Sequence, residues 1–275
     1  MSPPSVDQIL PLDLNPALIG FNNGVYDLDN NEFHEGKHMI SQSVGYDLPP
    51  KHVPHREEIL KFLTQLFYFH PPVVDYILDV LSLGLYGRNL RHKVFLWVGE
   101  GGNGKSTLNE LIKLTFGEYA KTLHLASTGL SPELAYCHGV KYSHRSELGE
   151  DANLTDELSV FNELAGAGAG TGAGTVYVRR LYQSGYDMPV TFTPHLSANR
   201  LPEVSMKSIE VIPFNSRFVT NVNEINEMAG VFMADTELHQ KLKVWAPSFM
   251  RILLERHAEV RQRVRENTLT SPVEW

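Results

Sequence analysis

The sequence is poor in cysteine. Its 275 residues include only Cys137, so no disulfide can form within the chain, and a reducing compartment is the simplest expectation. Long hydrophobic runs are also missing, since the best one, YILDVLSLGLYG, is short and contains Asp79. The first ten residues, MSPPSVDQIL, lack the basic start and apolar centre of a signal peptide. These absences predict a cytoplasmic protein with no membrane partner.

A surplus of positive charge is absent as well. Lysine and arginine number 24 against 32 aspartate and glutamate residues, which gives a net charge of −8. This balance excludes a protein coated in positive charge for nucleic acid, but it is compatible with a local basic loop. Because 42% of the residues are hydrophobic, the chain is expected to bury an ordinary core, as one large domain or two small ones.

The two ends of the chain are expected to be partly helical. The stretch ALIGFNNGVYDLDNNEF is typical of a hairpin that turns at Asn23 and Gly24, a pair that tolerates the positive φ of a tight turn. Apolar spacing predicts helices over residues 56–70 and 72–87, so residues 1–90 are interpreted as an N-terminal module. The C-terminal end is predicted to hold two helices, the second beginning at Pro247.

The stretch GEGGNGKST, residues 99–107, fits the phosphate-loop pattern G-x-x-x-x-G-K-[ST] at every fixed position. The apolar run Val94–Val98 precedes it as a buried strand would, and the apolar spacing after it predicts a helix. In that context backbone N–H groups and the positive helix end can surround a phosphate. The predicted nucleotide-binding residues are Gly99, Gly101, Gly102, Asn103, Gly104, Lys105, Ser106 and Thr107.

ATP with Mg²⁺ is the expected ligand. Lys105 would supply a point charge to the β- and γ-phosphates, and the Ser106 hydroxyl would hold the metal ion. An acid that orients water is expected in HRSELGED, which offers Glu147 and Glu150 after a possible strand. Asn199 ends a further predicted strand and could reach the γ-phosphate or the attacking water. Acidic turns and asparagines before turns are common, so these residues do not define a site by themselves.

Residues 165–175 consist only of glycine, alanine and threonine. Such a run has no side chains that could anchor it, so it predicts a loop that is poorly ordered in the absence of DNA. The segment VRRLY follows, in which Arg179 and Arg180 could hold phosphates and Tyr182 could contact a base. Two solvated arginines on a strand are an equally good reading of the residues alone. The basic end RHAEVRQRVRE is interpreted as a charged helix face that could also touch DNA.

In their order along the chain, FNNGVYDL, GEGGNGKST, SELGE, VRRLY, SANRLP and VIPFNSRF resemble the motifs of superfamily 3 helicases. The resemblance is to the helicase half of primase-helicases from poxviruses, other large DNA viruses and phages, and it runs from about residue 17 to about residue 257. It implies an α/β fold with an AAA+ ATPase core over residues 91–225 and a helical C-terminal segment over 226–275.

The resemblance also implies an activity and partners. The family members are DNA helicases that hydrolyse ATP and move on single-stranded or forked DNA during genome replication. They assemble as homo-oligomers, in hexameric rings, in the host cytoplasm or at a viral replication site, and this chain would use a primase in trans.

By position, Lys105 and Ser106 match the nucleotide lysine and the metal-binding hydroxyl of the family. Glu147 matches its catalytic Walker B acid, which also contacts the metal, and Asn199 matches its sensor asparagine. The strand before this acid is usually apolar in the family, whereas this chain has YSHR.

Arg179 matches an arginine of the family's DNA-contacting hairpin, with Arg180 and Tyr182 beside it. The Gly-Ala run stands where the family has GGD. The family also has an arginine before the last strand, which completes the site of a neighbouring subunit, but Ser208 stands there, after Lys207. Two nearby arginines are candidate substitutes, Arg217, which we take as the catalytic one, and Arg200.

Two other functions stay open. A nucleic-acid scaffold or initiator that binds ATP with little hydrolysis would agree with the polar strand and the displaced arginine. A P-loop kinase acting on a small substrate would also use residues 99–107. The absence of an N-K-x-D signature disfavours a GTPase.

Overall fold

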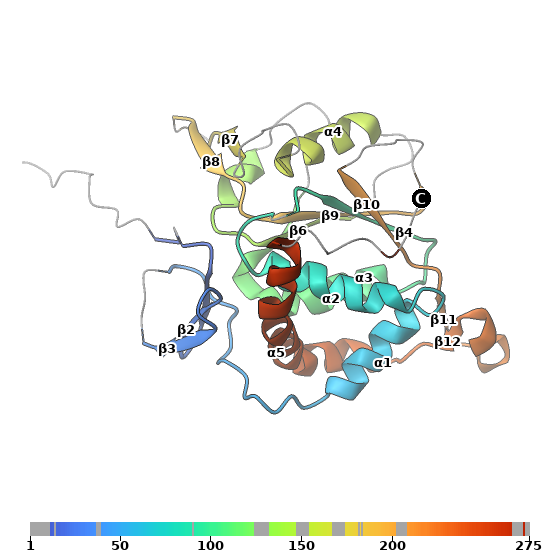
Figure 1. The fold of residues 1–275 in the computed structure, drawn as a ribbon. Helices are drawn as coiled ribbons and strands as arrows, with labels where there is room; N and C mark the ends of the chain where they lie inside the picture. Colours follow the sequence, from blue (N-terminus) through green and yellow to red (C-terminus); the bar gives the residue numbers. More distant parts are fainter. Residues whose placement is uncertain are drawn as a thin grey trace, which may run out of the picture.

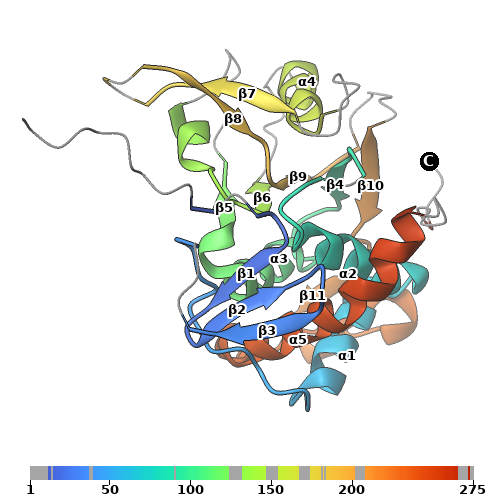
Figure 2. The same ribbon diagram turned by 60° about the vertical axis from the view of Figure 1, so that its left-hand side comes forward.

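The computed structural model describes residues 12–13, 15–36, 40–89, 91–123, 132–146, 154–166, 174–180, 182, 184–201, 208–265 and 272. In these residues the chain folds around one five-stranded parallel sheet with helices packed on it (Figures 1 and 2). The α/β class predicted from the sequence is confirmed.

The central sheet has the strand order β10-β4-β9-β6-β5, and every neighbouring pair is parallel. Its strands are β4 (Val94–Val98), β5 (Ala120–Thr122), β6 (Tyr142–Arg145), β9 (Thr193–Ala198) and β10 (Ile209–Pro213). The strand predicted over Val94–Val98 is confirmed. Because the strands are parallel, the segments that follow β4, β6 and β9 leave the sheet at one edge, where ligands of open α/β sheets bind.

Helices cover both faces of the sheet (Figure 1). They are α1 (Arg56–Leu66), α2 (Pro72–Gly84), α3 (Lys105–Phe116), α4 (Leu154–Leu164) and α5 (Leu238–Arg265). Side chains of β4 alternate between the two layers. Val94 and Leu96 join a buried cluster with α4, whereas Phe95 and Trp97 join a cluster with the other four helices.

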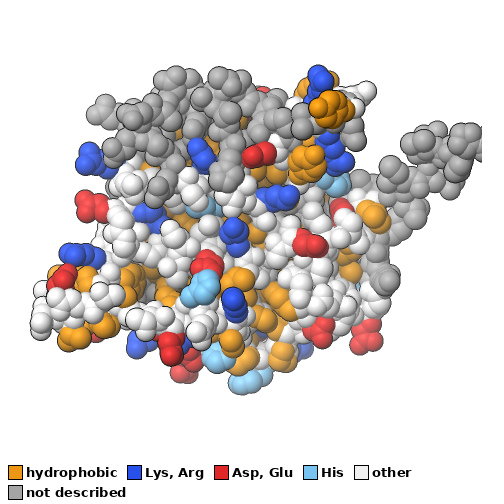
Figure 3. All heavy atoms as spheres, turned by 180° about the vertical axis from the view of Figure 1, so that it is seen from behind, with side chains coloured by type: hydrophobic (Ala, Val, Ile, Leu, Met, Phe, Trp, Pro, Cys, Tyr) orange, Lys and Arg blue, Asp and Glu red, His pale blue; other side chains and the backbone are white. Residues whose placement is uncertain are grey.

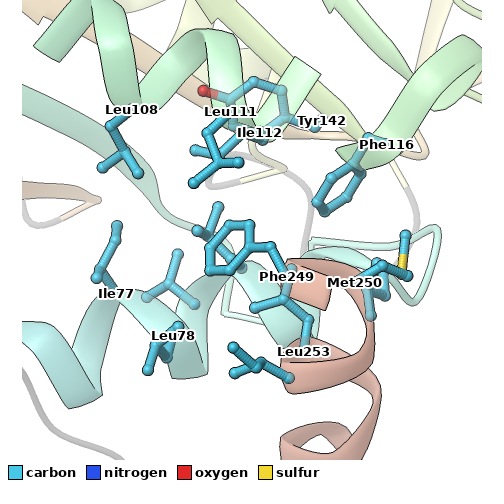
Figure 4. Packing of buried hydrophobic residues seen from close by; sticks show 14 of the residues in the cluster. Ile77, Leu78, Leu108, Leu111, Ile112, Phe116, Tyr142, Phe249, Met250 and Leu253 are labelled. Carbon is cyan, nitrogen blue, oxygen red and sulfur yellow. The ribbon is translucent and has the colours of Figure 1, made fainter. Parts of the chain in front are cut away.

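The larger cluster is one core shared by segments that lie far apart in the chain. It includes residues of β1, β2, α1, α2, β4, α3 and α5. Figure 4 shows α2, α3 and α5 meeting there, with Ile77, Leu111, Phe249 and Leu253 all fully buried. Each side chain of this kind stabilises the fold by about 1.5–3 kcal/mol. The predicted N-terminal module, ATPase core and C-terminal segment thus share one hydrophobic core. The boundaries predicted between them, near residues 90 and 225, stay a prediction.

A small antiparallel sheet precedes the helices: β1 (Leu18–Phe21), β2 (Gly24–Asp27) and β3 (Glu32–Glu35). The predicted hairpin is confirmed, but its turn is not as predicted. Phe21 pairs with Gly24, so the turn lies at residues 22 and 23, and neither Asn23 nor Gly24 has a positive φ. Gly24 is required for a different reason, since a Cβ there would lie 2.3 Å from the carbonyl oxygen of His34 in β3.

The C-terminal end differs from the sequence prediction. Instead of two helices with Pro247 at the start of the second, α5 is one 28-residue helix with Pro247 inside it. An internal proline removes one helical hydrogen bond and costs about 3 kcal/mol. Trp245, Phe249 and Leu253 are buried on either side of it, against α1, α2 and α3. Their burial outweighs the loss, so the helix continues.

Two stretches expected as single strands are divided. MPVTFTPHLSAN begins with the last two residues of β8 (Tyr186–Pro189), which forms an antiparallel hairpin with β7 (Thr175–Val178), and then contains β9 of the central sheet. SIEVIPFNSRFV contains β10, which ends at Pro213, and β11 (Arg217–Val219). β11 pairs in parallel with β12 (Val231–Met233). We call residues 217–233 the β11–β12 lobe, and it projects from the body of the molecule in Figure 1.

The surface shows no large field of one sign in the face seen in Figure 3, where acidic and basic side chains are interspersed. Apolar side chains gather over the β11–β12 lobe, in which Val222 and Met228 are exposed. Among the described residues, no helix combines the length and the apolar character needed to cross a membrane.

Candidate functional site

The phosphate loop connects β4 to α3, as the sequence predicts. Gly102 and Gly104 have φ of +76° and +83°, a region that favours glycine. A Cβ at Gly104 would also lie 2.3 Å from Cδ2 of Leu66, and one at Gly99 would lie 2.3 Å from the carbonyl oxygen of Phe214. The glycines therefore let the loop pass close to α1 and to the end of β10.

Lys105 is buried at the start of α3, and its ammonium group is turned back into the loop. It contacts the Gly99 carbonyl oxygen and donates to the Glu100 carbonyl oxygen at 3.3 Å and to Asn103 Oδ1 at 3.1 Å. These partners are neutral oxygens of the loop itself. A negatively charged phosphate would compete well with them, because it adds a Coulombic attraction to the ammonium group that neutral oxygens do not provide.

The Asn103 side chain has a role that the motif did not predict. Its Nδ2 donates to the Phe214 carbonyl oxygen at 3.1 Å, just beyond the end of β10. On the other side of the loop, the Phe218 backbone N–H donates to the Gly102 carbonyl oxygen at 2.9 Å. The phosphate loop is thus fastened on two sides by the segment that leads from β10 to β11.

The N-terminus of α3 is available to an anion. Its N-cap residue, Gly104, provides no side-chain hydrogen bond, and the first turn contains no acidic residue. Ser106 is exposed and Thr107 is half-buried on this turn. Uncapped N–H groups and the positive helix end favour phosphate at this position.

A cavity of about 590 Å³ lies beyond the carboxyl ends of β4, β9 and β10. Six residues that the sequence analysis singled out line it: Gly99, Gly101, Asn103, Asn199, Arg200 and Arg217. Asn199 follows β9 directly and is exposed. The fold therefore brings the predicted sensor asparagine to the phosphate loop, although about a hundred residues separate them in the chain.

Both candidate arginines belong to this cavity. Arg200 lines its wall, and Arg217 lines it while forming an ion pair with Glu224, with 3.2 Å between Nη2 and Oε2. The Arg217 side chain is 65% exposed, so the pair contributes little to stability. Ser208, in the place of the family's arginine, contacts Asn162 through its hydroxyl, whereas Lys207 lies outside the described residues.

A second cleft of about 330 Å³ lies on the other side of the phosphate loop. It shares Gly102, Gly104 and Thr107 with the loop, and its remaining walls include Phe62 from α1, Phe218 from β11 and His239 from α5. His239 Nδ1 lies 2.8 Å from Oε1 of Glu110 across this cleft. Sequence reasoning missed these residues because three distant elements supply them and no local motif marks them.

The strand expected to carry the catalytic acid is β6, and its polar sequence YSHR is buried in the sheet. The Tyr142 hydroxyl donates to Asn109 Oδ1 on α3 at 3.0 Å, and His144 Nε2 lies 2.9 Å from Ser197 Oγ on β9. Tyr142 and His144 can replace apolar residues here because neighbouring elements provide hydrogen-bond partners, whereas the buried Ser143 hydroxyl has none among the described residues. Glu147 and Glu150 lie outside the described residues.

The two central histidines are held neutral. Burial lowers the pKa of His144 to about 4 and that of His195 to about 3. The rings of Trp97 and Tyr142 pack against both of them, with centroid distances of 4.7–6.5 Å. The sheet beneath the phosphate loop is therefore a rigid aromatic layer rather than a second charged site.

Within the described part of the chain, no group of three or more histidine, cysteine or acidic side chains could hold a metal ion. Mg²⁺ with a nucleotide does not need such a group, since it takes one or two protein ligands, phosphate oxygens and water. The exposed Ser106 hydroxyl, on the first turn of α3, fits that requirement.

The β7–β8 hairpin carries the predicted DNA-contacting residues at its tip. Tyr182 is 99% exposed, and Arg179 is exposed. Figure 3 shows basic and apolar side chains together at this tip, at the upper right. Arg180 differs, because its guanidinium donates to the Ala135 carbonyl oxygen at 3.4 Å and lies 5.4 Å from the ring centroid of Tyr136. Residues 167–173 of the Gly-Ala run lie outside the described residues.

The basic C-terminal helix is engaged within the molecule. Arg256 pairs with Asp75 and Asp79 of α2, and Arg263 also pairs with Asp79, at 2.7 Å. Arg261 contacts Asp29 and lies 4.3 Å from the ring centroid of Tyr86. These contacts support the reading of this end as a structural charged face.

Comparisons with known proteins agree with the motif order. Residues 5–68 match the family described as "D5 N terminal like". The chain is similar to "Putative helicase L207/L206" of Acanthamoeba polyphaga mimivirus, with 31% identity over 270 residues covering 89% of this chain and 27% of that protein. It is also similar to "Putative helicase 184R" of Invertebrate iridescent virus 6, with 27% identity covering 84% of this chain and 26% of that protein.

The chain spans about a quarter of the length of these curated relatives. The predicted resemblance to helicases of large DNA viruses is confirmed. Among solved structures, the apo C-terminal region of NrS-1 matches with a TM-score of 0.55 and 19% identity, covering 81% of this chain and 53% of that one. At that identity the match supports the fold.

Proposed function

We propose that this chain is the ATP-driven motor portion of a DNA helicase or translocase that acts in the replication of a large DNA virus, phage or related element. The observation that carries the proposal is the 590 Å³ cavity, where the phosphate loop, Asn199 and Arg217 meet at the carboxyl edge of the sheet. The names of the viral relatives support the replication role, and the residues below support the mechanism.

ATP would lie along the phosphate loop, with its phosphates against the N-terminus of α3 and its base and ribose in the 330 Å³ cleft. Lys105 would exchange its loop carbonyls for the β- and γ-phosphate oxygens. Mg²⁺, held by Ser106 and Glu147, would neutralise charge on the phosphates. Asn199 would orient the γ-phosphate, and Glu147 would orient and polarise the attacking water.

The second substrate would be single-stranded or forked DNA, held by the exposed tip of the β7–β8 hairpin. Arg179 would bind backbone phosphate and Tyr182 would contact bases. Hydrolysis would take place at subunit interfaces of a homo-oligomeric ring, which we take to be hexameric. Arg200 and Arg217 stand at the open cavity that a neighbouring copy would cover, and a primase would act as a separate chain.

Measurement of ATP turnover with and without single-stranded DNA tests this function. We expect the wild type to hydrolyse ATP faster when DNA is present, and both Lys105→Ala and Asn199→Ala to lose turnover by orders of magnitude. Lys113→Ala is the matched control, because this exposed lysine lies on the same helix but outside both cavities. DNA binding without turnover in the wild type would instead indicate a scaffold. Turnover that ignores DNA would favour a small-substrate kinase.

A further inference from the structure

Lys141 is a buried lysine that forms no ion pair within 4.0 Å in the described part of the chain, although the Asp13 carboxylate attracts its ammonium group from a longer distance. Its side chain precedes β6 at the end of the sheet opposite the phosphate loop, and the residue is only 3% exposed. Nζ donates to the Pro16 carbonyl oxygen at 2.8 Å and lies 5.4 Å from the ring centroid of Tyr119. A carbonyl and an aromatic face stabilise a cation weakly compared with a counter-ion. Burial accordingly lowers the pKa of Lys141 to about 7.

This ammonium group lines a cavity of about 120 Å³. The basic and acidic side chains that line it besides Lys141 are Arg88, which is exposed, His138, which is half-buried, and Asp13, and the neutral polar residues on the wall are Asn15, Tyr119 and Thr191. The Asp13 carboxylate already accepts hydrogen bonds from the Ser41 backbone N–H, at 2.8 Å, and from its hydroxyl. The cavity thus has two basic side chains against one carboxylate that is already hydrogen-bonded. A bound anion would favour the charged form of Lys141, so the wall suits an anion better than a cation.

The size of the cavity limits the anion. A water molecule occupies about 30 Å³ of liquid, so the space corresponds to roughly four waters. One tetrahedral oxyanion fits, and a larger ligand would have to extend out of the cavity. Gly87 keeps this space open, since a Cβ there would lie 3.2 Å from Lys141 Nζ.

The cavity lies at the root of the β7–β8 hairpin. Pro189, the last residue of β8, lines it together with Val190 and Thr191, which lead into β9. Figure 2 shows β5 and the start of β1 below this hairpin, on the side where the chain leaves β8. An anion bound here would contact the base of the element whose tip carries Arg179 and Tyr182.

We infer that Lys141 and Arg88 form a binding site for one phosphate group at the root of the β7–β8 hairpin. The phosphate would come from the DNA strand that the hairpin contacts. Only this source rests on the proposed function, because the site itself follows from the two basic side chains and the cavity. The site is separate from the phosphate loop, which lies at the other end of the sheet.

The site is tested with inorganic phosphate and the full chain carrying Lys105→Ala, so that the phosphate loop contributes little. Phosphate is exchanged for chloride at constant ionic strength, and the unfolding midpoint is followed. We expect phosphate to raise the midpoint. Adding Lys141→Met should remove the rise, and adding Arg88→Ala should weaken phosphate affinity about tenfold. Lys121→Met, a half-buried lysine of β5 outside the cavity, should leave the response unchanged.

Replacement of a buried charge by an apolar side chain of similar size is often neutral for stability, and Arg88 is exposed, so both variants should fold. An equal response to phosphate in all variants would overturn the site. DNA affinity then identifies the source. Loss of one phosphate contact should reduce the salt slope of oligonucleotide binding by about one in Lys141→Met and Arg88→Ala.

If the phosphate response disappears while DNA affinity and its salt slope stay the same, the site is supported but the DNA strand is excluded as its source. A 5′-phosphorylated and a 5′-hydroxyl oligonucleotide are compared in the same titration. A difference between them that Lys141→Met removes would place a terminal phosphate in the cavity. None of these readouts depends on ATP turnover, so they stand apart from the test of the proposed function.

Discussion

His144 and Ser197 are hydrogen-bonded across the sheet, with 2.9 Å between Nε2 and Oγ. Both side chains are buried. Their strands, β6 and β9, lead to Glu147 and Asn199, which we propose as the catalytic acid and the sensor. The hydrogen bond therefore joins two strands whose following residues would, in the proposed mechanism, act on the same phosphate.

Acid should destabilise the protein, because His144 and His195 are buried in their neutral forms within the aromatic layer of the central sheet. Burial lowers the pKa of His144 to about 4 and that of His195 to about 3, whereas an unfolded histidine titrates near 6.5. Between pH 6.5 and 4 the unfolded chain therefore binds more protons, so the free energy of unfolding falls as the pH falls, by up to about 1.4 kcal/mol per pH unit for each histidine. Urea unfolding at pH 7, 6 and 5 measures this slope.

The variant His144→Gln should reduce that slope by about one proton. His52→Gln, at an exposed position, is the control and should keep the wild-type slope. A slope that is the same in both variants would show that His144 does not contribute to acid sensitivity.

The catalytic acid can be assigned by a pair of substitutions. Glu147→Gln keeps the shape of the side chain but removes the base and the charge, so ATP should still bind while turnover falls by orders of magnitude. Glu150→Gln should retain most of the turnover. ATP binding is measured by nucleotide fluorescence and turnover by phosphate release. The opposite pattern would place the acid at Glu150.

The two hairpin arginines should behave differently. Arg179 is exposed, so Arg179→Ala should reduce DNA-stimulated turnover and lower the salt slope of DNA binding by about one, with basal turnover nearly intact. Arg180 contacts Ala135 and Tyr136 and positions the hairpin. Arg180→Lys keeps the charge but not the guanidinium geometry, so it should impair DNA stimulation without changing the salt slope. Unwinding by the double alanine variant at the wild-type rate would contradict a role for this hairpin.

Gly104 should be hard to replace, because both its backbone conformation and its surroundings disfavour a side chain. An alanine there would need φ near +83° and would meet Leu66, so Gly104→Ala should lower the free energy of unfolding by about 1–3 kcal/mol. Gly101→Ala is the matched control, because nothing lies within 4 Å of a Cβ at that position. Its change should stay within about 0.5 kcal/mol. Chemical denaturation of both variants gives the comparison.

Local sequence patterns were sufficient to predict the structure wherever residues that are neighbours in the chain determine it. The buried strand Val94–Val98, the glycine-rich loop and the helix beginning at Lys105 are contiguous, so the sequence predicts all three. Asn199 could be placed at a strand end, but its approach to the loop depends on the strand order of the sheet. Phe62 and His239 were not predicted, because only the packing of α1 and α5 brings them to the second cleft.

Two errors have the same cause. Pro247 has the local character of a helix start, and Asn23-Gly24 that of a tight turn with positive φ. In the fold, burial of Trp245 and Phe249 keeps α5 continuous, and the close approach of β3 explains Gly24. Long-range packing outweighed a local preference of a few kcal/mol at both positions.

The hydrogen bond from the Phe218 backbone N–H to the Gly102 carbonyl oxygen joins the phosphate loop to the first strand of the β11–β12 lobe. The lobe is small, projects from the body and exposes Met228 and Val222. A loop that reshapes itself around an incoming phosphate must either break this bond or carry β11 with it. If a nucleotide binds as we propose, occupancy of its site would thereby be coupled to the orientation of an apolar surface, and an adjoining molecule resting on that surface would sense whether the site is filled.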